Sequence, residues 1–276
     1  MDYTLNIRGR LMSLAQPVVM GILNVTPDSF YADSRMQNEA EVARRARQIV
    51  DEGAAIIDIG ACSTRPGAEL ATQQQEMERL RMALGVVRHE LPDAVLSVDT
   101  FRSDVARMAV EEYGVDIIND VGTPHLSPPT SRLPMLRIVS RLHVPYVLMS
   151  SEATLEKTLL FFADQVQQLR DMGHKDIVLD PGFGFGKTVE QNYALLASME
   201  KLLVMEYPLL VGISRKSMIY RLLGITPDES LNGTTALHAV ALMKGASILR
   251  VHDVKEAVEC CKLMAALNIN RKSVNR

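Results

Sequence analysis

The feature that most constrains the fold is a recurring pair of segments, an apolar run followed by a stretch with helical periodicity. The apolar runs cover residues 18–25, 55–59, 94–98, 115–118, 145–149, 176–179, 209–213 and 247–251. Most are followed by segments with the period of an amphipathic helix, among them 40–52, 73–89, 103–112, 155–172 and 235–244. Strands that alternate with helices predict a parallel sheet, because parallel neighbours need a crossover connection.

Eight such units of about 30 residues predict a (β/α)8 TIM barrel. The alternative is an open, doubly wound sheet. We favour the barrel because eight units of even length close naturally in that fold, and 276 residues is a normal length for it. Residues 4–14 alternate weakly around Arg8-Gly9-Arg10 and predict a short N-terminal β-hairpin at one end of the sheet. No linker-like or repeated segment divides the sequence, so we expect one domain over residues 1–276.

The composition limits the cellular compartments and the classes of partner that this chain is expected to have. A net charge of −3 argues against a nucleic-acid or an anionic-membrane surface. The sequence contains no signal peptide and no apolar run of membrane length. Cys62, Cys260 and Cys261 lack a zinc-type spacing, and two of them are adjacent. We therefore expect a cytoplasmic protein with no nucleic-acid partner and no membrane partner.

The segment DPGFGFGKT, residues 180–188, follows an apolar strand with a carboxylate and three glycines. A Walker A loop needs glycine where Pro181 stands, and a dinucleotide fingerprint needs glycine where Lys187 stands. The segment therefore predicts a glycine loop with a carboxylate and a cation, distinct from the standard phosphate cradles. We expect Asp180 to offer a bidentate acceptor to a ligand above the sheet.

In such a barrel the active site lies at the carboxyl ends of the strands, where polar residues gather in every unit. One group suits a flat heterocycle with N–H donors and a carbonyl, and comprises Asp99, Asn119, Asp180 and Lys216. A second group suits a phosphate or pyrophosphate, and comprises Thr64, Arg65, Arg250 and His252. The second group would suit a sugar-phosphate enzyme equally well. The first group therefore provides the argument for a heterocyclic substrate.

Local spacing adds detail to the second group. Arg250 and His252 alternate along the last strand, so we expect their side chains on one face. In a closed barrel that strand pairs with the first, which brings Asn24 beside them. We expect Ser217 to begin a short helix whose N-terminus attracts an anion. Taken one at a time, each of these residues is equally well explained as a solvated loop residue or a helix cap.

Seven segments occur in the order and at the spacing found in dihydropteroate synthases, and the chain resembles that family from residue 20 to 254. They are MGILNVTPDSF, STRPG, SVDT, IIND, DPGFGFGK, GISRKS and RVHDV. The family is a (β/α)8 barrel that joins 6-hydroxymethyl-7,8-dihydropterin pyrophosphate to p-aminobenzoate, releasing pyrophosphate and 7,8-dihydropteroate. The resemblance implies a transferase of folate biosynthesis that is a sulfonamide target. It also implies two small-molecule substrates, Mg2+ as cofactor and a homodimer.

Carried over by motif, the resemblance implies a role for individual residues. The expected catalytic residues are Asp99, Lys216 and Arg250, because the family mechanism is dissociative and leaves a pterin cation and a departing pyrophosphate. The expected substrate contacts are Asp99, Asn119, Asp180 and Lys216 for the ring, Met149, Phe185, Gly212 and Ser217 around the ring and the aminobenzoate, and Asn24, Thr64, Arg65, Arg250 and His252 for the pyrophosphate. Asn24 is also the expected protein ligand of Mg2+.

The chain departs from the family pattern at Cys62, where many members have glutamate, and at Ser150, where histidine is frequent. We expect Cys62 to be an inert thiol. Two other functions remain open. A methyltransferase that uses methyltetrahydrofolate shares the ring-binding carboxylate and amide, but it has no pyrophosphate to hold, so Arg65, Arg250 and His252 favour the synthase. A non-enzymatic pterin binder would have lost a charge at the rim.

Overall fold

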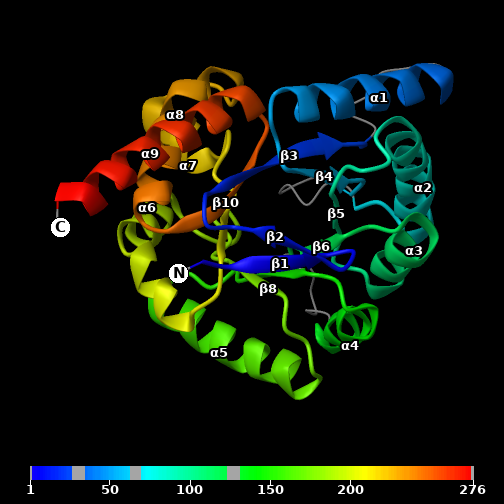
Figure 1. The fold of residues 1–276 in the computed structure, drawn as a ribbon, viewed down its shortest axis with the longest axis horizontal. Helices are drawn as coiled ribbons and strands as arrows, with labels where there is room; N and C mark the ends of the chain where they lie inside the picture. Colours follow the sequence, from blue (N-terminus) through cyan, green and yellow to red (C-terminus); the bar gives the residue numbers. More distant parts are fainter. Residues whose placement is uncertain (1, 27–34, 63–69, 123–130, 275–276) are drawn as a thin grey trace.

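The computed structural model describes residues 2–26, 35–62, 70–122 and 131–274. Eight parallel strands form a closed barrel in the order β10-β3-β4-β5-β6-β7-β8-β9 (Figure 1). Each strand lies within two residues of an apolar run in the sequence, so the barrel is confirmed and the open sheet is excluded. The bounds are β3 Val18–Asn24, β4 Ile56–Gly60, β5 Leu96–Asp99, β6 Ile117–Asp120, β7 Tyr146–Met149, β8 Ile177–Asp180, β9 Leu209–Val211 and β10 Ala246–Val251.

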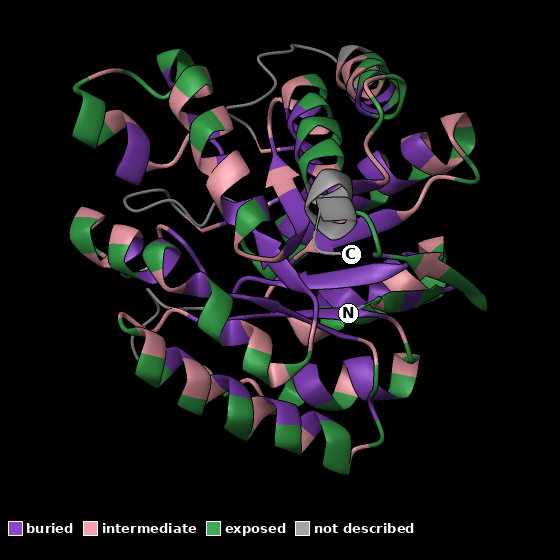
Figure 2. Ribbon diagram, turned by 60° about the vertical axis from the view of Figure 1, so that its left-hand side comes forward, coloured by how far each residue is buried: buried purple, intermediate pink, exposed green. Residues whose placement is uncertain are grey.

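Helices surround the barrel and turn their buried faces toward the strands (Figure 2). Thr72 and Thr188 begin α2 and α6 with complete capping boxes, which satisfy backbone N–H groups at the helix starts. The helices are α1 Arg35–Asp51, α2 Gln73–Glu90, α3 Ser103–Tyr113, α4 Leu133–Leu142, α5 Leu155–Asp171, α6 Val189–Ala197, α7 Ser217–Leu223, α8 Leu231–Met243 and α9 Val254–Val274, with 3-10 turns η2 Met199–Met205 and η3 Asp228–Ser230. Among the described residues, no helix is both long enough and apolar enough to cross a membrane.

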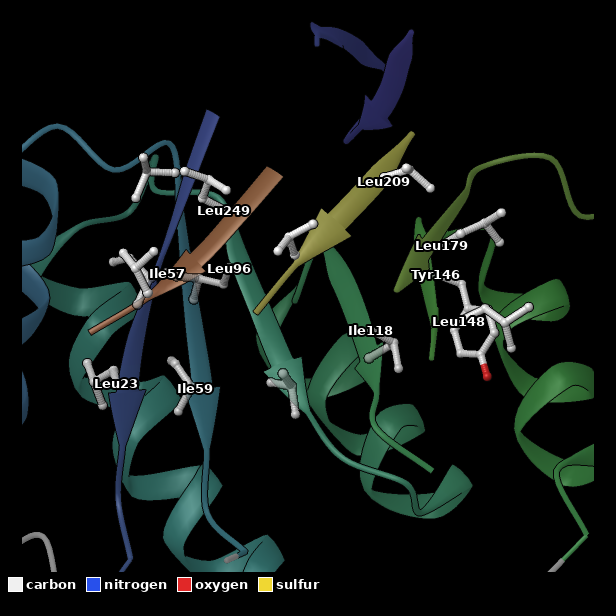
Figure 3. Close-up of a cluster of buried hydrophobic side chains, with 14 of the residues drawn as sticks. Leu23, Ile57, Ile59, Leu96, Ile118, Tyr146, Leu148, Leu179, Leu209 and Leu249 are labelled. Atoms are coloured by element: carbon white, nitrogen blue, oxygen red, sulfur yellow. The ribbon is translucent and has the colours of Figure 1, made fainter. Parts of the chain in front are cut away.

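Side chains alternate along each strand between the helix layer and the barrel interior. The outward set packs beneath the helices and includes Leu23, Ile57, Ile59, Leu96, Ile118, Tyr146, Leu148, Leu179, Leu209 and Leu249 (Figure 3). The inward set near the amino ends of the strands, here called the inner layer, comprises Met20, Ile56, Ile117, Val147, Val178, Leu210 and Ile248. Two residues further along four of these strands, the inward position is polar, at Asp58, Asn119, Asp180 and Arg250. The strand period therefore separates an apolar floor from a polar upper layer.

The predicted hairpin is present as β1 Thr4–Ile7 and β2 Arg10–Ser13, which pair antiparallel. Arg8 and Gly9 both adopt positive φ, at 52° and 79°, as a two-residue hairpin turn requires. Leu5 and Ile7 pack into the same cluster as the inner layer. Arg8 forms an ion pair with the buried carboxylate of Asp116 at 2.9 Å. The hairpin therefore closes the amino end of the barrel, which leaves the carboxyl ends of the strands for a ligand.

Candidate active site

Arg250 lies at the centre of the polar upper layer, two residues after Ile248 of the inner layer. Its Nε donates to Oδ2 of Asp58 and its Nη2 donates to Oδ2 of Asp99, both at 2.6 Å. Nδ2 of Asn119 donates to the same Asp58 oxygen at 3.0 Å. These contacts join β4, β5, β6 and β10 across the barrel interior. Arg250 is therefore bonded to two carboxylates and, through Asp58, to a residue of the predicted ring-binding group.

The low-dielectric interior shifts the protonation of these groups. Burial is the largest influence on Asp99, and together with nearby Asp58 it raises the pKa of Asp99 to about 7 despite the opposing effect of Arg250. Burial alone would lower the pKa of Arg250, but the carboxylates of Asp58 and Asp99 outweigh it and hold that pKa above its ordinary value. The site thus combines a permanent cation with a carboxyl group that changes charge near neutral pH.

Asp180 ends β8 and holds the loop that follows it. Its Oδ1 accepts the backbone N–H of Gly182 at 2.7 Å, so one carboxylate oxygen already serves the loop and the other is the one to offer to a ligand. Burial raises the pKa of Asp180, and Lys216 opposes that shift. Gly182 has a φ of +66°, and a Cβ there would lie 2.0 Å from the carbonyl oxygen of Ser150. Glycine is therefore required where the chain leaves the strand.

Lys216 lies over the same loop. Its ammonium donates to the carbonyl oxygen of Phe183 and sits 4.4 Å from the centroid of the Phe185 ring. Burial lowers the pKa of Lys216 to about 8, and Asp180 opposes the shift. A Cβ on Gly184 would lie 2.8 Å from Cδ of Lys216, so the glycine leaves room for the lysine side chain. Lys216, Phe185 and Asp180 therefore belong to one local unit.

Lys187, the cation of the DPGFGFGKT segment, serves the loop rather than the barrel interior. Its ammonium donates to the carbonyl oxygens of Gly182 at 2.9 Å, Phe185 at 3.3 Å and Ser150 at 3.4 Å. Burial lowers the pKa of Lys187 to about 8. Three carbonyl contacts on one ammonium fix the curvature of the loop.

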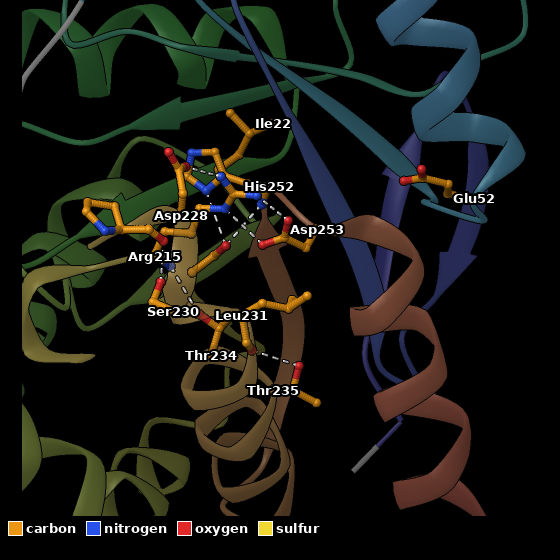
Figure 4. Close-up of polar contacts among 12 residues, drawn as sticks. Ile22, Glu52, Arg215, Asp228, Ser230, Leu231, Thr234, Thr235, His252 and Asp253 are labelled. Carbon is orange, nitrogen blue, oxygen red and sulfur yellow. Dashed lines mark hydrogen bonds and ion pairs between the residues drawn. The ribbon is translucent and has the colours of Figure 1, made fainter. Parts of the chain in front are cut away.

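His252 is joined to the loop after β9 (Figure 4). Its Nδ1 lies 3.2 Å from Oγ of Ser214, which also accepts the His252 backbone N–H at 3.1 Å. Next to this contact, Arg215 binds Asp253 through Nε at 3.1 Å and Nη2 at 2.6 Å, and binds Asp228 at 2.8 Å. The loops after β9 and β10 are thereby fastened to each other. Alternation placed Arg250 and His252 on one face, but their hydrogen bonds connect them to different neighbours.

Two further predicted residues lie close to this network. The amide oxygen of Asn24, at the end of β3, lies 3.2 Å from an ideal Cβ on Gly60. Glycine at that position keeps the approach to Asn24 open. Gly212 follows β9, and an ideal Cβ there would lie 3.8 Å from Cβ of Arg250, so Gly212 packs beside the arginine stem. As predicted, β10 pairs with β3, so Arg250 and Asn24 lie on neighbouring strands.

Of the remaining predicted residues, two lie within the described residues and two lie outside them. Met149 is buried at the end of β7, and its Cγ lies 3.1 Å from an ideal Cβ on Gly182. Ser217 is the first residue of α7, as predicted, and directly follows Lys216. Thr64 and Arg65 lie outside the described residues.

Sequence reasoning did not single out Asp58, whose signal is a lone acidic residue inside the apolar run 55–59. It also passed over Ser214, the partner of His252. Asp120, the last residue of β6, faces the helix layer, where it accepts from the Tyr146 hydroxyl at 2.5 Å and pairs with Arg132 at 3.3 Å. Asp120 therefore stabilises the outside of the barrel, whereas Asp58 belongs to its interior.

Comparison with known proteins shows which family the chain and its fold resemble. Residues 20–252 match the family model described as pterin binding enzyme. The dihydropteroate synthase of Escherichia coli (strain K12) is 36% identical over 94% of this chain and 94% of its own, and that of Bacillus subtilis (strain 168) is 37% identical over 94% and 90%. The structure resembles a Xanthomonas albilineans dihydropteroate synthase with 4-aminobenzoic acid, at a TM-score of 0.88 and 33% identity, over 97% of this chain and 99% of that chain.

Proposed function

Because the chain belongs to the dihydropteroate synthase family, we propose that it joins 6-hydroxymethyl-7,8-dihydropterin pyrophosphate to p-aminobenzoate, releasing pyrophosphate and 7,8-dihydropteroate. The observation that carries the proposal is the polar upper layer, in which a buried arginine bridges two carboxylates beside an amide whose buried oxygen has no hydrogen-bond partner among the described residues. Such a set can hold a heterocycle and an anion side by side. A methyltransferase would have no use for the buried arginine as an anion donor.

The pterin ring would lie among Asp99, Asn119, Asp180 and Lys216. Oδ1 of Asn119 is buried and has no hydrogen-bond partner among the described residues, so it is suited to accept a ring N–H. The second oxygen of Asp180 would accept from the amino edge of the ring. Lys216 would donate to a ring carbonyl or nitrogen, and Met149 would pack against the ring face. Each acceptor of the site then finds a donor on the pterin.

The reaction needs charge stabilisation rather than a nucleophilic side chain. When the bond between the pterin methylene carbon and the pyrophosphate oxygen breaks, positive charge develops on the pterin and negative charge on the leaving group. Nη2 of Arg250 would turn from Asp99 to the pyrophosphate, and Asp99 would then face the developing cation. The amine of p-aminobenzoate would attack the same carbon and then release one proton to solvent, which leaves dihydropteroate and pyrophosphate as the products. Asp99, Lys216 and Arg250 are thus the proposed catalytic residues.

Mg2+ is the proposed cofactor, with Asn24 as its protein ligand. Within the described ranges, no group of three or more His, Cys, Asp or Glu side chains is arranged to hold a metal. The amide oxygen of Asn24, which lies beside Gly60, nevertheless fits a magnesium ion, because Mg2+ keeps several waters and takes much of its coordination from substrate phosphates. When bound, the ion would neutralise charge on the pyrophosphate.

His252, Thr64 and Arg65 complete the proposed pyrophosphate site. If the Ser214 hydroxyl donates to Nδ1 of His252, Nε2 carries the ring proton and becomes a donor for an anion. Phe185, Lys216 and Ser217 would line the p-aminobenzoate site. A Yersinia pestis dihydropteroate synthase of similar structure, with a TM-score of 0.84 and 35% identity over 96% of this chain and 99% of that chain, is a sulfonamide drug complex. We propose that sulfonamides compete with p-aminobenzoate here too.

A homodimer and a cytoplasmic location stay predictions. Large apolar side chains are exposed on three consecutive helices, at Leu222 and Leu223 of α7, Met243 of α8, and Leu263 and Leu267 of α9. Such a surface supports association, because monomers rarely leave several large apolar groups in water together. Sedimentation equilibrium of the purified protein measures the assembly directly, and a monomer at micromolar concentration would contradict the dimer.

One assay tests the proposed reaction. The protein is mixed with the pterin pyrophosphate, p-aminobenzoate and Mg2+, and both pyrophosphate and dihydropteroate are quantified. We expect the two products in equal amounts, and neither when p-aminobenzoate is left out. Methyl transfer from methyltetrahydrofolate without pyrophosphate release would favour the methyltransferase, and pterin binding without turnover would favour the non-enzymatic binder.

A further inference from the structure

Asp58 joins the two halves of the proposed substrate site through a single oxygen atom. Its Oδ2 accepts the Nε–H of Arg250 at 2.6 Å and an Nδ2–H of Asn119 at 3.0 Å. The side chain of Asp58 is 0% exposed, so these bonds are made without competition from bulk water. The three residues come from β4, β6 and β10, and the contact therefore crosses the barrel interior.

A carboxylate at position 58 fixes the orientation of Asn119. An ionised carboxylate only accepts hydrogen bonds, so the amide must present its NH2 group to Asp58 and turn its carbonyl oxygen away. That oxygen is buried and, within the described part of the chain, has no partner. A buried acceptor is costly to leave unsatisfied, which makes it a place for a ligand N–H.

Arg250 is held by the same oxygen. Its Nε is bonded to Asp58 while its Nη2 is bonded to Asp99 at 2.6 Å. When an anion draws Nη2 away from Asp99, the bond at Nε still holds the plane of the guanidinium. Asp58 thereby allows Arg250 to exchange one partner without losing its position.

We propose that Asp58 is a positioning residue for the condensation, whose carboxylate turns the Asn119 carbonyl toward the pterin and anchors Arg250 for the leaving pyrophosphate. This inference rests on the proposed function for the identity of the two ligands. A purely structural Asp58 would affect stability and leave both affinities unchanged. A positioning Asp58 couples recognition of the ring to recognition of the pyrophosphate.

The first test replaces Asp58 and measures two ligands by calorimetry, 6-hydroxymethylpterin and its pyrophosphate. We expect Asp58→Asn to weaken binding of both by about tenfold or more, because Asn119 loses its fixed orientation and Arg250 its charged anchor. The matched control is Asp120→Asn, a buried carboxylate of the next layer outward, which should lower the melting temperature and leave both affinities unchanged. His252→Ala should weaken only the pyrophosphate ligand. Wild-type affinities in Asp58→Asn would overturn the proposal.

The second test exchanges the two partners. Asp58→Asn/Asn119→Asp keeps the charge and the hydrogen-bonding groups, with an amide NH2 at 58 donating to a carboxylate at 119 that still faces the ligand as an acceptor. We expect the exchange to recover about tenfold or more of the 6-hydroxymethylpterin affinity lost in the single variant. An affinity that stays at the single-variant level would contradict the proposal. If the single variant is too unstable to study, an exchange variant that folds but binds 6-hydroxymethylpterin at least about tenfold more weakly than the wild type would contradict it instead. If neither variant folds, Asp58 is a residue of barrel assembly and the proposal falls.

Binding and turnover measured on the wild-type protein distinguish a failure of this inference from a failure of the proposed function. If the wild type binds both pterins but makes no dihydropteroate, the proposed reaction fails while the affinities of the variants still decide the role of Asp58. If the wild type makes dihydropteroate and Asp58→Asn binds normally, the reaction stands and the positioning role fails. If the wild type binds neither pterin, both are wrong.

Discussion

At the scale of the residue, the described part of the barrel interior holds more acidic than basic side chains. Asp58, Asp99 and Asp180 supply three carboxylates, against the guanidinium of Arg250 and the ammonium of Lys216. Burial is the main cause of the raised pKa values of Asp99 and Asp180, and the neighbouring carboxylate of Asp58 adds to the rise at Asp99. The excess of acidic side chains would stabilise a cationic intermediate. The protein without substrate is therefore less stable than it could be, at the place where the reaction needs negative charge.

The shift at Asp99 predicts a pH dependence of stability. Folded Asp99 keeps its proton up to a pKa of about 7, whereas the unfolded chain releases it near pH 4. Between these values the folded state binds the extra proton, so the free energy of unfolding falls as pH rises. We expect the stability of the wild type relative to Asp99→Asn to fall by up to about 4 kcal/mol across this window. Urea denaturation of both proteins measures it, and parallel pH curves would refute the shift.

Asp180→Asn should remove pterin binding without unfolding the loop. The amide carbonyl can still accept the Gly182 N–H that Oδ1 now accepts at 2.7 Å, but the amide NH2 then meets the donors of the ring. A mismatched donor pair and the loss of a charge-assisted bond should cost about 2–4 kcal/mol of binding free energy. Calorimetry with 6-hydroxymethylpterin gives the value. Unchanged affinity would remove Asp180 from the ring site.

At the scale of the element, the loop between β8 and α6 is held in shape by three glycines and by Lys187. Gly182, Gly184 and Gly186 all have positive φ, which other residues adopt with strain. Asn192 of α6 accepts the Gly184 N–H at 2.7 Å, so the helix that follows also fixes the loop. The loop in turn sets the position of Lys216, which lies against Gly184.

Gly184→Ala should therefore weaken ligand binding more than Gly186→Ala. Both substitutions force alanine into positive φ, with a backbone cost of about 1–2 kcal/mol each. Only the first places a methyl group 2.8 Å from Cδ of Lys216, whereas the nearest atom to the second is the Ser151 carbonyl oxygen at 3.4 Å. We expect about tenfold lower affinity for 6-hydroxymethylpterin in Gly184→Ala and little change in Gly186→Ala. Equal losses would mean that backbone strain alone matters.

The elements were predictable where the periodicity was strong. The eight strands follow from apolar runs. Among the helices, α6 was not predicted because it is short and mostly apolar, and α9 was not predicted because it lacks a marked apolar stripe. α4 is an exception, because it was also missed although one of its faces is clearly apolar. The site followed from strand ends, which a barrel must bring together. Asp58 was not predicted as a site residue because it lies inside an apolar run that was used as evidence for a strand. Which residues of a strand point into the barrel becomes clear only once the register of the strand is known.

At the scale of the whole molecule, the N-terminal hairpin completes the inner layer from below. Leu5 is 1% exposed and packs with the inner layer, whereas Leu11 on the same hairpin is 74% exposed. Leu5→Ala should lower the free energy of unfolding by about 3 kcal/mol, because it opens a cavity at the floor of the barrel. Leu11→Ala should be neutral, and both should bind the pterin normally. Thermal and urea unfolding supply the stabilities, and a neutral Leu5→Ala would show that the hairpin is dispensable.

We also propose that residues 1–276 form one domain. The same measurements check this, since a single domain should unfold in one transition that is identical by fluorescence and circular dichroism. Two separated transitions would contradict the proposal.

Because the hairpin closes the amino end of the barrel, the fold also determines how substrates enter and products leave. With the hairpin under the inner layer, whatever reaches Asp58 and Asn119 arrives past the loops at the carboxyl ends of the strands and departs the same way. In the proposed site the pterin lies deepest and p-aminobenzoate lies above it near Phe185 and Lys216, so the pterin must bind first, and it leaves joined to p-aminobenzoate as dihydropteroate. Steady-state kinetics should accordingly show ordered rather than random binding of the two substrates, because both use the same opening of the barrel.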